Sequence, residues 1–385
     1  MSTKLVQYSR SIWLTRLAGL LFLSLFFVTC LVAQNGSATL PSTKIGDPTK
    51  PELQPRLDVD RDPLPSPDPD EIPPAVNTAA TTPAKAGEIQ KNQNGMYTLR
   101  ANVDEVLLNC TVIDDKGRTV TDLHQDAFRV WEDGVPQIVN SVQHEDLPVS
   151  LGILVDNSGS MRDKRSAVNV AAYKLLQASN PKDSAFIVNF SERAFLDQGF
   201  TSDLVALNRG LSRLDSHGTT AMYDAVAASA DELVKHAKER KQALLIITDG
   251  ADNASRMTLA QAVRRVQGLG GPVVYTIGLL FDVDKNEADR ARSALESLSE
   301  ETGGIAYFPR SVDELDTIAE EVARDIRNQY VVDYRSTKPA ALGGYRTVRV
   351  EAVGPGRGKL IVRTKKGYFA QAPQKATQVS QSVTQ

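Results

Sequence analysis

Cysteine and histidine are scarce in this chain of 385 residues. It holds two cysteines, Cys30 and Cys110, and four histidines, no two of which form a His-x-x-x-His pair. Two cysteines are too few for a disulfide scaffold or for a zinc site built from thiolates. Without a paired histidine motif, a zincin-type catalytic centre is also unsupported.

The chain also lacks a large excess of basic or of acidic side chains. The chain has 44 basic and 47 acidic side chains, which give a formal net charge of -3. Proteins that bind nucleic acid through a generally basic surface carry a clear positive excess. We therefore expect no nucleic-acid partner.

Acidic residues are absent from the N-terminal segment. Residues 1–16 carry Lys4, Arg10 and Arg16, and an apolar run follows at residues 17–28. A basic start before a short apolar run is typical of a secretory signal peptide, here residues 1–33 with cleavage after Ala33. Retention as a membrane anchor and lipidation at Cys30 stay open as alternatives. Each of them predicts an exported protein, located in the periplasm, the cell envelope or the extracellular space.

Proline is concentrated in one segment. Eleven of the 19 prolines lie between Pro41 and Pro83, and apolar side chains are sparse around them. Such a segment cannot bury enough apolar surface to offset the ordering of its backbone. We expect a disordered linker over residues 34–95 and a disordered tail over residues 371–385.

Two segments show the strict alternation of half-buried β-strands, residues 96–147 and 328–370. Each is small to fold alone, and together they are about as long as an immunoglobulin-like sandwich. We expect one discontinuous β-sandwich, with two separate small β units as the alternative. Residues 354–358 predict a hairpin turn. Cys110 is expected on a buried face, and Trp131 in the core.

Between these flanks, residues 148–327 have a different pattern. Near-continuous apolar runs occur at 149–155, 185–190, 243–248 and 273–279, and amphipathic helical stripes separate them. Strands that are apolar on both faces belong to a parallel sheet covered by helices on each side. The pattern predicts an α/β domain with a doubly wound, mostly parallel sheet. Ser311 and Glu314 predict a capping box at the last helix.

Oxygen-bearing side chains gather where these predicted strands end. The first central strand runs into the sequence DNSGSM at 156–161, GTTAMYDA follows at 218–225, and TDG at 248–250 ends a later strand. In a doubly wound sheet, ligands bind outside the carboxyl ends of the strands. Carboxylates and hydroxyls without sulfur or imidazole suit a hard cation such as Mg²⁺ or Mn²⁺, and Ca²⁺ less specifically.

These residues resemble the von Willebrand factor type A (VWA) domain and its metal-ion-dependent adhesion site. The family pattern Asp-x-Ser-x-Ser is matched by Asp156, Ser158 and Ser160. Its later threonine and aspartate are matched by Thr220 and Asp249. The resemblance implies that the three hydroxyls lie at the metal, and that the two aspartates act directly or through water.

The flanks at 112–139 and 344–370 resemble those of exported bacterial proteins related to this domain. The resemblance implies a metal-dependent binding module that captures an acidic residue of a protein partner, and not an enzyme. One alternative is a structural envelope subunit whose metal only stabilises the fold. The other is a hydrolase with Ser158 or Ser160 as nucleophile, which lacks a Gly-x-Ser-x-Gly elbow and a strong base.

Simpler interpretations stand beside these. Residues 156–160 are also compatible with a helix-capping turn, because Asp and Ser are favoured there. Asp252 is expected to be a solvated loop residue, and Tyr223 and Asp224 to pack and cap around a helix start. His217 is expected in solvent, with a place at the rim of the site as the alternative.

Overall fold

The computed structural model describes residues 55–58, 89–91, 97–99, 105–144, 146–213, 217–268 and 271–370. The predicted signal peptide, most of the predicted linker and the predicted tail lie outside these residues. Within the described part of the chain, none of the helices is both long and apolar enough to cross a membrane.

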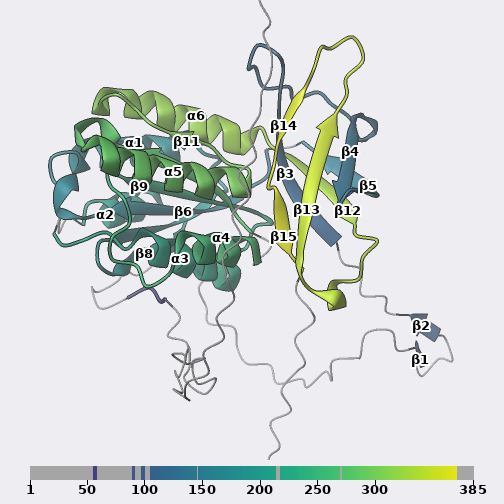
Figure 1. Cartoon of the computed structure of the whole chain (residues 1–385), viewed down its shortest axis with the longest axis horizontal. Coiled ribbons are helices and arrows are strands. Elements are labelled where there is room, and N and C mark those ends of the chain that lie inside the picture. Colours follow the sequence, from purple (N-terminus) through teal and green to yellow (C-terminus); the bar gives the residue numbers. More distant parts are fainter. Residues whose placement is uncertain are drawn as a thin grey trace, which may run out of the picture. The chain divides into compact units, whose positions relative to one another are not determined.

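The central part of the chain is an α/β unit around one six-stranded sheet (Figure 1). Five strands are parallel, and only the last one in the spatial order pairs antiparallel with its neighbour. In spatial order the strands are β11 (Ala306–Tyr307), β10 (Val273–Gly278), β9 (Lys241–Thr248), β6 (Val149–Asp156), β7 (Ser184–Phe190) and β8 (Ala194–Thr201). The four predicted apolar runs are β6, β7, β9 and β10, so the predicted mostly parallel sheet is confirmed.

Helices cover both faces of this sheet. One face packs against α1 (Arg165–Ala178), α2 (Leu204–Leu211) and α6 (Leu315–Arg327). The other packs against α3 (Met222–His236), α4 (Leu259–Gly268) and α5 (Lys285–Thr302). Along β6, Ile153 and Val155 face the first group while Leu154 faces the second, as a strand buried on both sides requires.

The packing on β6 requires one glycine. A Cβ at Gly152 would lie 2.4 Å from Cζ of Phe186 and 2.6 Å from Cδ2 of Leu244. Such distances are far inside van der Waals contact, so the neighbouring strands approach β6 this closely only because residue 152 has no side chain.

The flanks combine into a second, seven-stranded antiparallel sheet. β12 (Tyr330–Arg335), from the C-terminal flank, lies between β3 (Glu105–Ile113) and β5 (Val135–Gln143) of the N-terminal flank. The full order is β14 (Ile361–Arg363), β3, β12, β5, β4 (Phe128–Glu132), β13 (Tyr345–Ala352) and β15 (Gly367–Phe369). Because strands of the two flanks interleave, two separate small β units are excluded.

Both ends of this sheet contribute to one apolar core. Cys110 and Leu108 of β3, Val130 of β4 and Val350 of β13 are buried together in it. The predicted sandwich is therefore built from one curled sheet. Cys110 is buried as predicted, and burial raises the pKa of its thiol to about 12.

Three local predictions about these parts are wrong. Residues 354–358 do not close a hairpin, because β14 pairs with β3 rather than with β13. Trp131 is half-buried rather than in the core, and its ring lies 3.9 Å beneath the guanidinium of Arg349. Ser311 makes no capping bond with its side chain, and Glu314 accepts from the amide of Arg310 instead.

Two segments within the predicted linker have defined structure. β1 (Ile89–Lys91) pairs with β2 (Tyr97–Leu99). Asp58 bridges to Phe195 at the edge of β8, where its amide donates to the carbonyl of Ala194 over 2.7 Å. Leu57 packs against the apolar core that β6, β7 and α3 share, so an apolar contact accompanies the pairing of residues 55–58 with β8.

The remaining short elements are single 3₁₀ turns: η1 (Gln125–Ala127), η2 (Gly159–Met161), η3 (Leu280–Asp282), η4 (Val312–Glu314) and η5 (Ala340–Leu342).

Candidate metal site

Asp156 is the last residue of β6, at the carboxyl edge of the parallel sheet. The chain turns directly after it, because the amide of Asn157 donates to the carbonyl of Phe190 over 2.6 Å. The amide of Ser158 then donates to Oδ1 of Asp156 over 2.8 Å. The turn continues through η2 into α1, but the side chains at the starts of these two elements, Ser158 and Lys164, make no capping hydrogen bond. The bond from the Ser158 amide instead wraps the backbone around a buried carboxylate.

Asp249 directly follows β9, the parallel neighbour of β6. It therefore lies at the same carboxyl edge of the sheet as Asp156. The hydroxyl of Ser160 donates to Oδ1 of Asp249 over 2.8 Å. The hydroxyl oxygens of Ser158 and Ser160 lie 3.2 Å apart. Four of the five predicted ligands, Asp156, Ser158, Ser160 and Asp249, are thus joined in one network.

Thr220 reaches this edge through its backbone. Its amide donates to Oδ1 of Asn253 over 2.8 Å, and the amide of Ala221 donates to the carbonyl of Ser191 over 2.6 Å. Gly218, with a φ of 81°, allows the loop before it to turn in the left-handed region that favours glycine. Thr220 is buried, but no hydrogen bond joins its hydroxyl to the four other predicted ligands, all of which lie in the described part of the chain.

The two carboxylates of the site are almost completely buried. The pKa of Asp156 is raised to about 6. Burial is the main cause and the charge of Asp249 contributes, while hydrogen bonds from Thr248 and Ser158 oppose the shift. The bond from Oγ1 of Thr248 to Oδ2 of Asp156 is 2.5 Å long. Two buried acids this close together make a negative site in a medium that screens charge poorly.

A lysine that the sequence reasoning missed lies in the same network. Nζ of Lys164 is 2.9 Å from Oδ2 of Asp249, and the lysine side chain is only 11% exposed. The same ammonium lies 5.3 Å from the centroid of the Phe281 ring. Lys164 stands four residues after Ser160 and just before α1, and this helical spacing is the one sequence signal that could have indicated it.

A second cation, Arg165, lies behind Asp156 in the interior. Its Nη2 donates to Oδ1 of Asn189, whose amide in turn donates to Oδ2 of Asp197 over 2.5 Å. Burial lowers the pKa of Arg165 to about 10, and Asp156 and Asp197 oppose this shift. No local sequence pattern indicated that this arginine is buried beside the site.

The other residues considered at this edge hold loops in place. Oδ2 of Asp252 accepts from the amide of Tyr223 over 2.8 Å and from the hydroxyl of Ser255 over 2.6 Å, so Asp252 is more than a solvated loop residue. The carboxylate of Asp224 accepts the amides of Arg256 and Met257, so it holds the loop before α4 and does not cap the start of α3 as expected. His217 is exposed, and its amide donates to the carbonyl of Asn157.

The donor set of the predicted ligands fits a hard divalent cation. It consists of two buried carboxylates and three hydroxyls, with no sulfur or imidazole among them. Within the residues that the structure describes, groups of three or more His, Cys, Asp or Glu able to hold a metal ion are not found.

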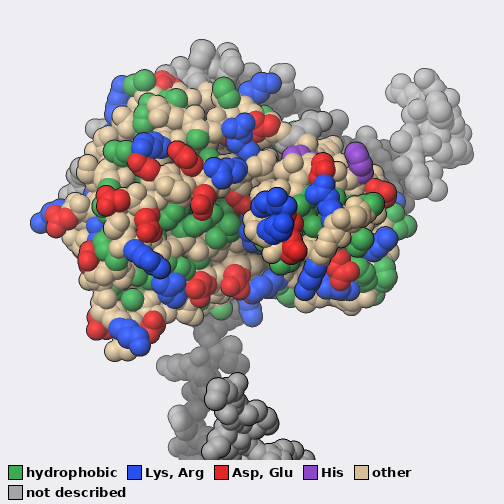
Figure 2. Space-filling view, turned by 90° about the horizontal axis from the view of Figure 1, so that it is seen from above, with side chains coloured by type: hydrophobic (Ala, Val, Ile, Leu, Met, Phe, Trp, Pro, Cys, Tyr) green, Lys and Arg blue, Asp and Glu red, His purple; other side chains and the backbone are tan. Residues whose placement is uncertain are grey.

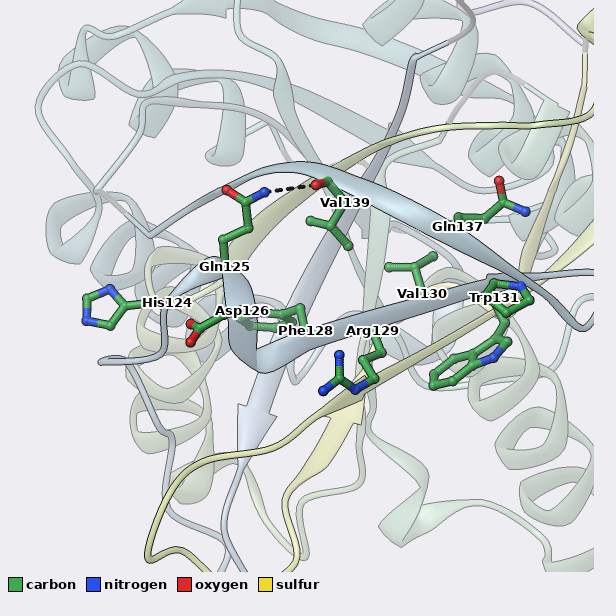
Figure 3. A pocket seen from close by; sticks show the side chains of 10 residues that line it. His124, Gln125, Asp126, Phe128, Arg129, Val130, Trp131, Gln137 and Val139 are labelled. Carbon is green, nitrogen blue, oxygen red and sulfur yellow. Dashed lines mark hydrogen bonds between the residues drawn. The ribbon is translucent and has the colours of Figure 1, made fainter.

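A large cavity lies elsewhere, on the β part (Figure 3). It is a shallow depression of 1120 Å³ over η1, β4 and β5, and it contains none of the predicted ligands. Gln125 at its border donates to the carbonyl of Val139 over 2.8 Å. Asp126, Arg129 and His124 are exposed there, so the depression lacks the buried charges that mark the edge of the α/β unit.

Comparisons with solved structures find similar chains at low sequence identity. A von Willebrand factor type A protein from Catenulispora acidiphila is 15% identical, with a TM-score of 0.42, over 71% of this chain and 74% of its own. Proximal thread matrix protein 1 from the mussel byssus, solved with zinc in its MIDAS motif, is 17% identical, with a TM-score of 0.42, over 51% of this chain and 50% of its own. The vWF domain of the type V pilus tip protein Mfa5 from Porphyromonas gingivalis is 10% identical, with a TM-score of 0.40, over 47% of this chain and 95% of its own.

A search of curated proteins finds no match. The family model of the von Willebrand factor type A domain matches residues 151–251, which run from β6 past the end of β9 and so contain all five predicted ligands. Residues 151–251 of the α/β part thus match the von Willebrand factor type A domain.

Proposed function

We propose that the chain is a metal-dependent protein-binding module of the cell envelope. A divalent cation held by Asp156, Ser158, Ser160, Thr220 and Asp249 would capture an acidic side chain of a protein partner. Mg²⁺ is the cation expected first, with Mn²⁺ and Ca²⁺ as alternatives. Export of the protein is part of this proposal and rests on residues 1–33 alone.

One observation carries the proposal: two buried carboxylates and two serine hydroxyls form one network at the carboxyl edge of the sheet. Asp156 and Asp249 are almost fully buried, whereas Ser160 is exposed. A cation bound there would meet two protein charges and otherwise neutral oxygens. It would keep its attraction for a further anionic ligand from outside, because the protein charges no more than balance its own.

The kind of partner is supported by two further findings. The VWA family match supports the coarser statement that this part of the chain is an interaction module. On the face shown in Figure 2, basic and acidic side chains lie interspersed. Such a surface favours a protein partner over a nucleic acid, which requires a basic patch or stripe.

The hydrolase alternative gains little support from the geometry. The hydroxyl of Ser160 donates to a carboxylate that also pairs with Lys164, and the hydroxyl of Ser158 faces that of Ser160. A carboxylate engaged by an ammonium is a weak base for a serine nucleophile. The structural-subunit alternative differs from the proposal only in lacking a partner, so it has to be separated by experiment.

The test is affinity capture from an envelope extract with the full chain as bait. Mg²⁺ in one arm and a chelator in the other separate metal-dependent partners from the rest, and Asp156→Ala serves as a bait without the first predicted ligand. The proposal expects a partner retained by the wild-type chain with Mg²⁺ and lost in both other arms. Equal retention in all arms would contradict it.

A further inference from the structure

Lys164 occupies a position that matters for any cation at this site. Its ammonium is 2.9 Å from Oδ2 of Asp249, while Ser160 donates to Oδ1 of the same carboxylate. Both oxygens of Asp249 are therefore engaged, and one of them is engaged by a positive charge. A divalent cation bound at Asp249 would lie close to this ammonium.

We infer that Lys164 is the internal cation of the metal-free site and that it weakens metal binding by competing for Asp249. The inference rests on the proposed function, because it concerns the regulation of the same site. In the metal-free protein, the lysine compensates a carboxylate whose side chain is 1% exposed. Without that partner, Asp249 would stand as a second buried negative charge beside Asp156.

Repulsion sets the sign of the effect. A dication and an ammonium at the same carboxylate repel each other. This repulsion offsets part of the attraction between Asp249 and the metal, whether Lys164 moves away or stays. The ring of Phe281, 5.3 Å from Nζ, offers the ammonium a second favourable contact. The lysine then remains near the loaded site and leaves it with a net positive charge, which favours an anionic ligand.

Lys164 therefore makes metal binding depend more strongly on the partner. The cation binds more weakly than the two carboxylates alone would allow, and an acidic partner restores affinity by supplying negative charge. By linkage, whatever the partner adds to metal affinity, the metal adds to partner affinity.

The test is calorimetric titration of the full chain with Mg²⁺, in wild type, Lys164→Met and Lys164→Arg. Removal of the charge in Lys164→Met should tighten Mg²⁺ binding ~tenfold, because a unit positive charge that would repel the dication is lost. Lys164→Arg keeps the charge and should bind as wild type does. Lys164→Gln, which loses the charge but can still donate to Asp249, answers the same question if the methionine variant does not fold.

Lys174→Met is the matched control. Lys174 lies on the same helix, α1, and pairs with Asp316 on α6, so its removal costs one positive charge in an ion pair away from the predicted ligands. Its Mg²⁺ affinity should equal that of wild type. An equal tightening in Lys174→Met and Lys164→Met would reduce the effect to overall charge and overturn the inference.

Melting curves separate competition from a merely structural role. If Lys164 competes with the metal, Lys164→Met should melt lower than wild type in chelator and gain more from Mg²⁺. A structural role would lower the melting temperature equally with and without Mg²⁺, and this outcome would overturn the inference.

The inference and the proposed function fail in different ways. If wild type binds Mg²⁺, Asp156→Ala does not, and Lys164→Met binds no more tightly than wild type, the inference is wrong and the proposed function stands. If wild type binds no divalent cation, the proposed function falls and the inference falls with it.

Discussion

The two parts of this chain each bury acidic side chains, and they neutralise them in opposite ways. In the β part, Oε1 of Glu132 accepts from the hydroxyl of Ser336 over 2.7 Å and from Nη1 of Arg346 over 3.2 Å. Its Oε2 accepts from the hydroxyls of Tyr334 over 2.7 Å and Tyr368 over 2.9 Å. The single carboxylate thus has four donors, one of them a buried guanidinium.

The edge of the VWA domain is less compensated. There, two carboxylates share hydroxyls, one backbone amide and the ammonium of Lys164. Each oxygen of Glu132 thus has two donors, as expected of a structural network. At the Asp156–Asp249 site, only one of the two carboxylates has an ion pair with a lysine, and an exposed serine lies next to them. Under the proposed function, the contrast is between an acid buried for stability and acids buried for binding.

The largest expected effect comes from removal of the C-terminal flank. A chain that ends at Arg327 loses β12, and with it the strand that joins β3 to β5, as well as Arg346 and Tyr334 of the Glu132 cluster. Strands β3 to β5 should lose their hydrogen-exchange protection. Full protection in those strands would contradict the shared sheet.

A large effect is also expected from Arg346→Met. Breaking a buried ion pair by removing one partner typically costs ~3–5 kcal/mol, because the other charge stays buried. The loss of unfolding free energy, measured by denaturant titration, should be the same with Mg²⁺ and with chelator. Lys338→Met, which removes an exposed partner of Asp133, is the control and should cost less than ~1 kcal/mol. A loss that depends on Mg²⁺ would mean that the two clusters are coupled.

Unlike Arg346→Met, Asp156→Ala should lower stability only in the presence of Mg²⁺. A ligand that binds the folded state at a hundredfold excess over its dissociation constant stabilises it by about 2.7 kcal/mol, and this gain should vanish in the variant. In chelator, the variant should be as stable as wild type or slightly more so, because one buried carboxylate is gone. Thermal melting with and without Mg²⁺ measures both. Ser160→Ala and Thr220→Ala remove only neutral oxygens and should lose less of the gain.

The pH dependence should follow Asp156, whose pKa burial raises to about 6 from 3.8. The folded state then binds the proton more tightly than the unfolded state, so the chelated protein should lose stability as the pH rises from about 4 to about 6. Mg²⁺ binding requires the carboxylate, and its affinity should fall ~tenfold per unit below pH 6. Calorimetric titrations from pH 8 to 5 test this, and a constant affinity over that range would speak against Asp156 as a ligand.

The smallest effect is expected at the edge of β8. Leu57→Asp should release residues 55–58 and expose the amide of Leu196, which donates to the carbonyl of Asp58 over 3.1 Å. Faster hydrogen exchange at Leu196 should be accompanied by a stability loss of ~1 kcal/mol or less, since Leu57 is only partly buried. Neither acidic cluster should respond. A change in Mg²⁺ affinity would show that this segment reaches the metal site.

The sequence was sufficient where the signal is local and periodic. Continuous apolar runs identified β6, β7, β9 and β10, and because parallel strands share a carboxyl edge, Asp156 and Asp249 could be expected together. That the two flanks form one β unit was predicted from their sizes, since each is small to bury a core alone, but the interleaving of their strands was not.

What could not be predicted depends on distant partners. The pairing of β14 with β3 rather than β13 depends on how the sheet curls, which no turn sequence encodes. Trp131 has the large apolar side chain of a core residue, but it lies on the outer face of β4, under Arg349. In the sequence Lys164 looks like an ordinary surface lysine, and only the folded turn before α1 brings its long side chain to Asp249, which follows β9.

The central claim is that Asp156 belongs to a divalent-cation site, and its most direct test is calorimetric titration of Mg²⁺ into wild type and Asp156→Ala at pH 7.5. Melting of both proteins in chelator first establishes that the variant is folded. The account predicts saturable binding at one site in wild type and none in Asp156→Ala. Equal Mg²⁺ affinity in the two proteins would contradict it, and the proposed adhesion function would lose its main support.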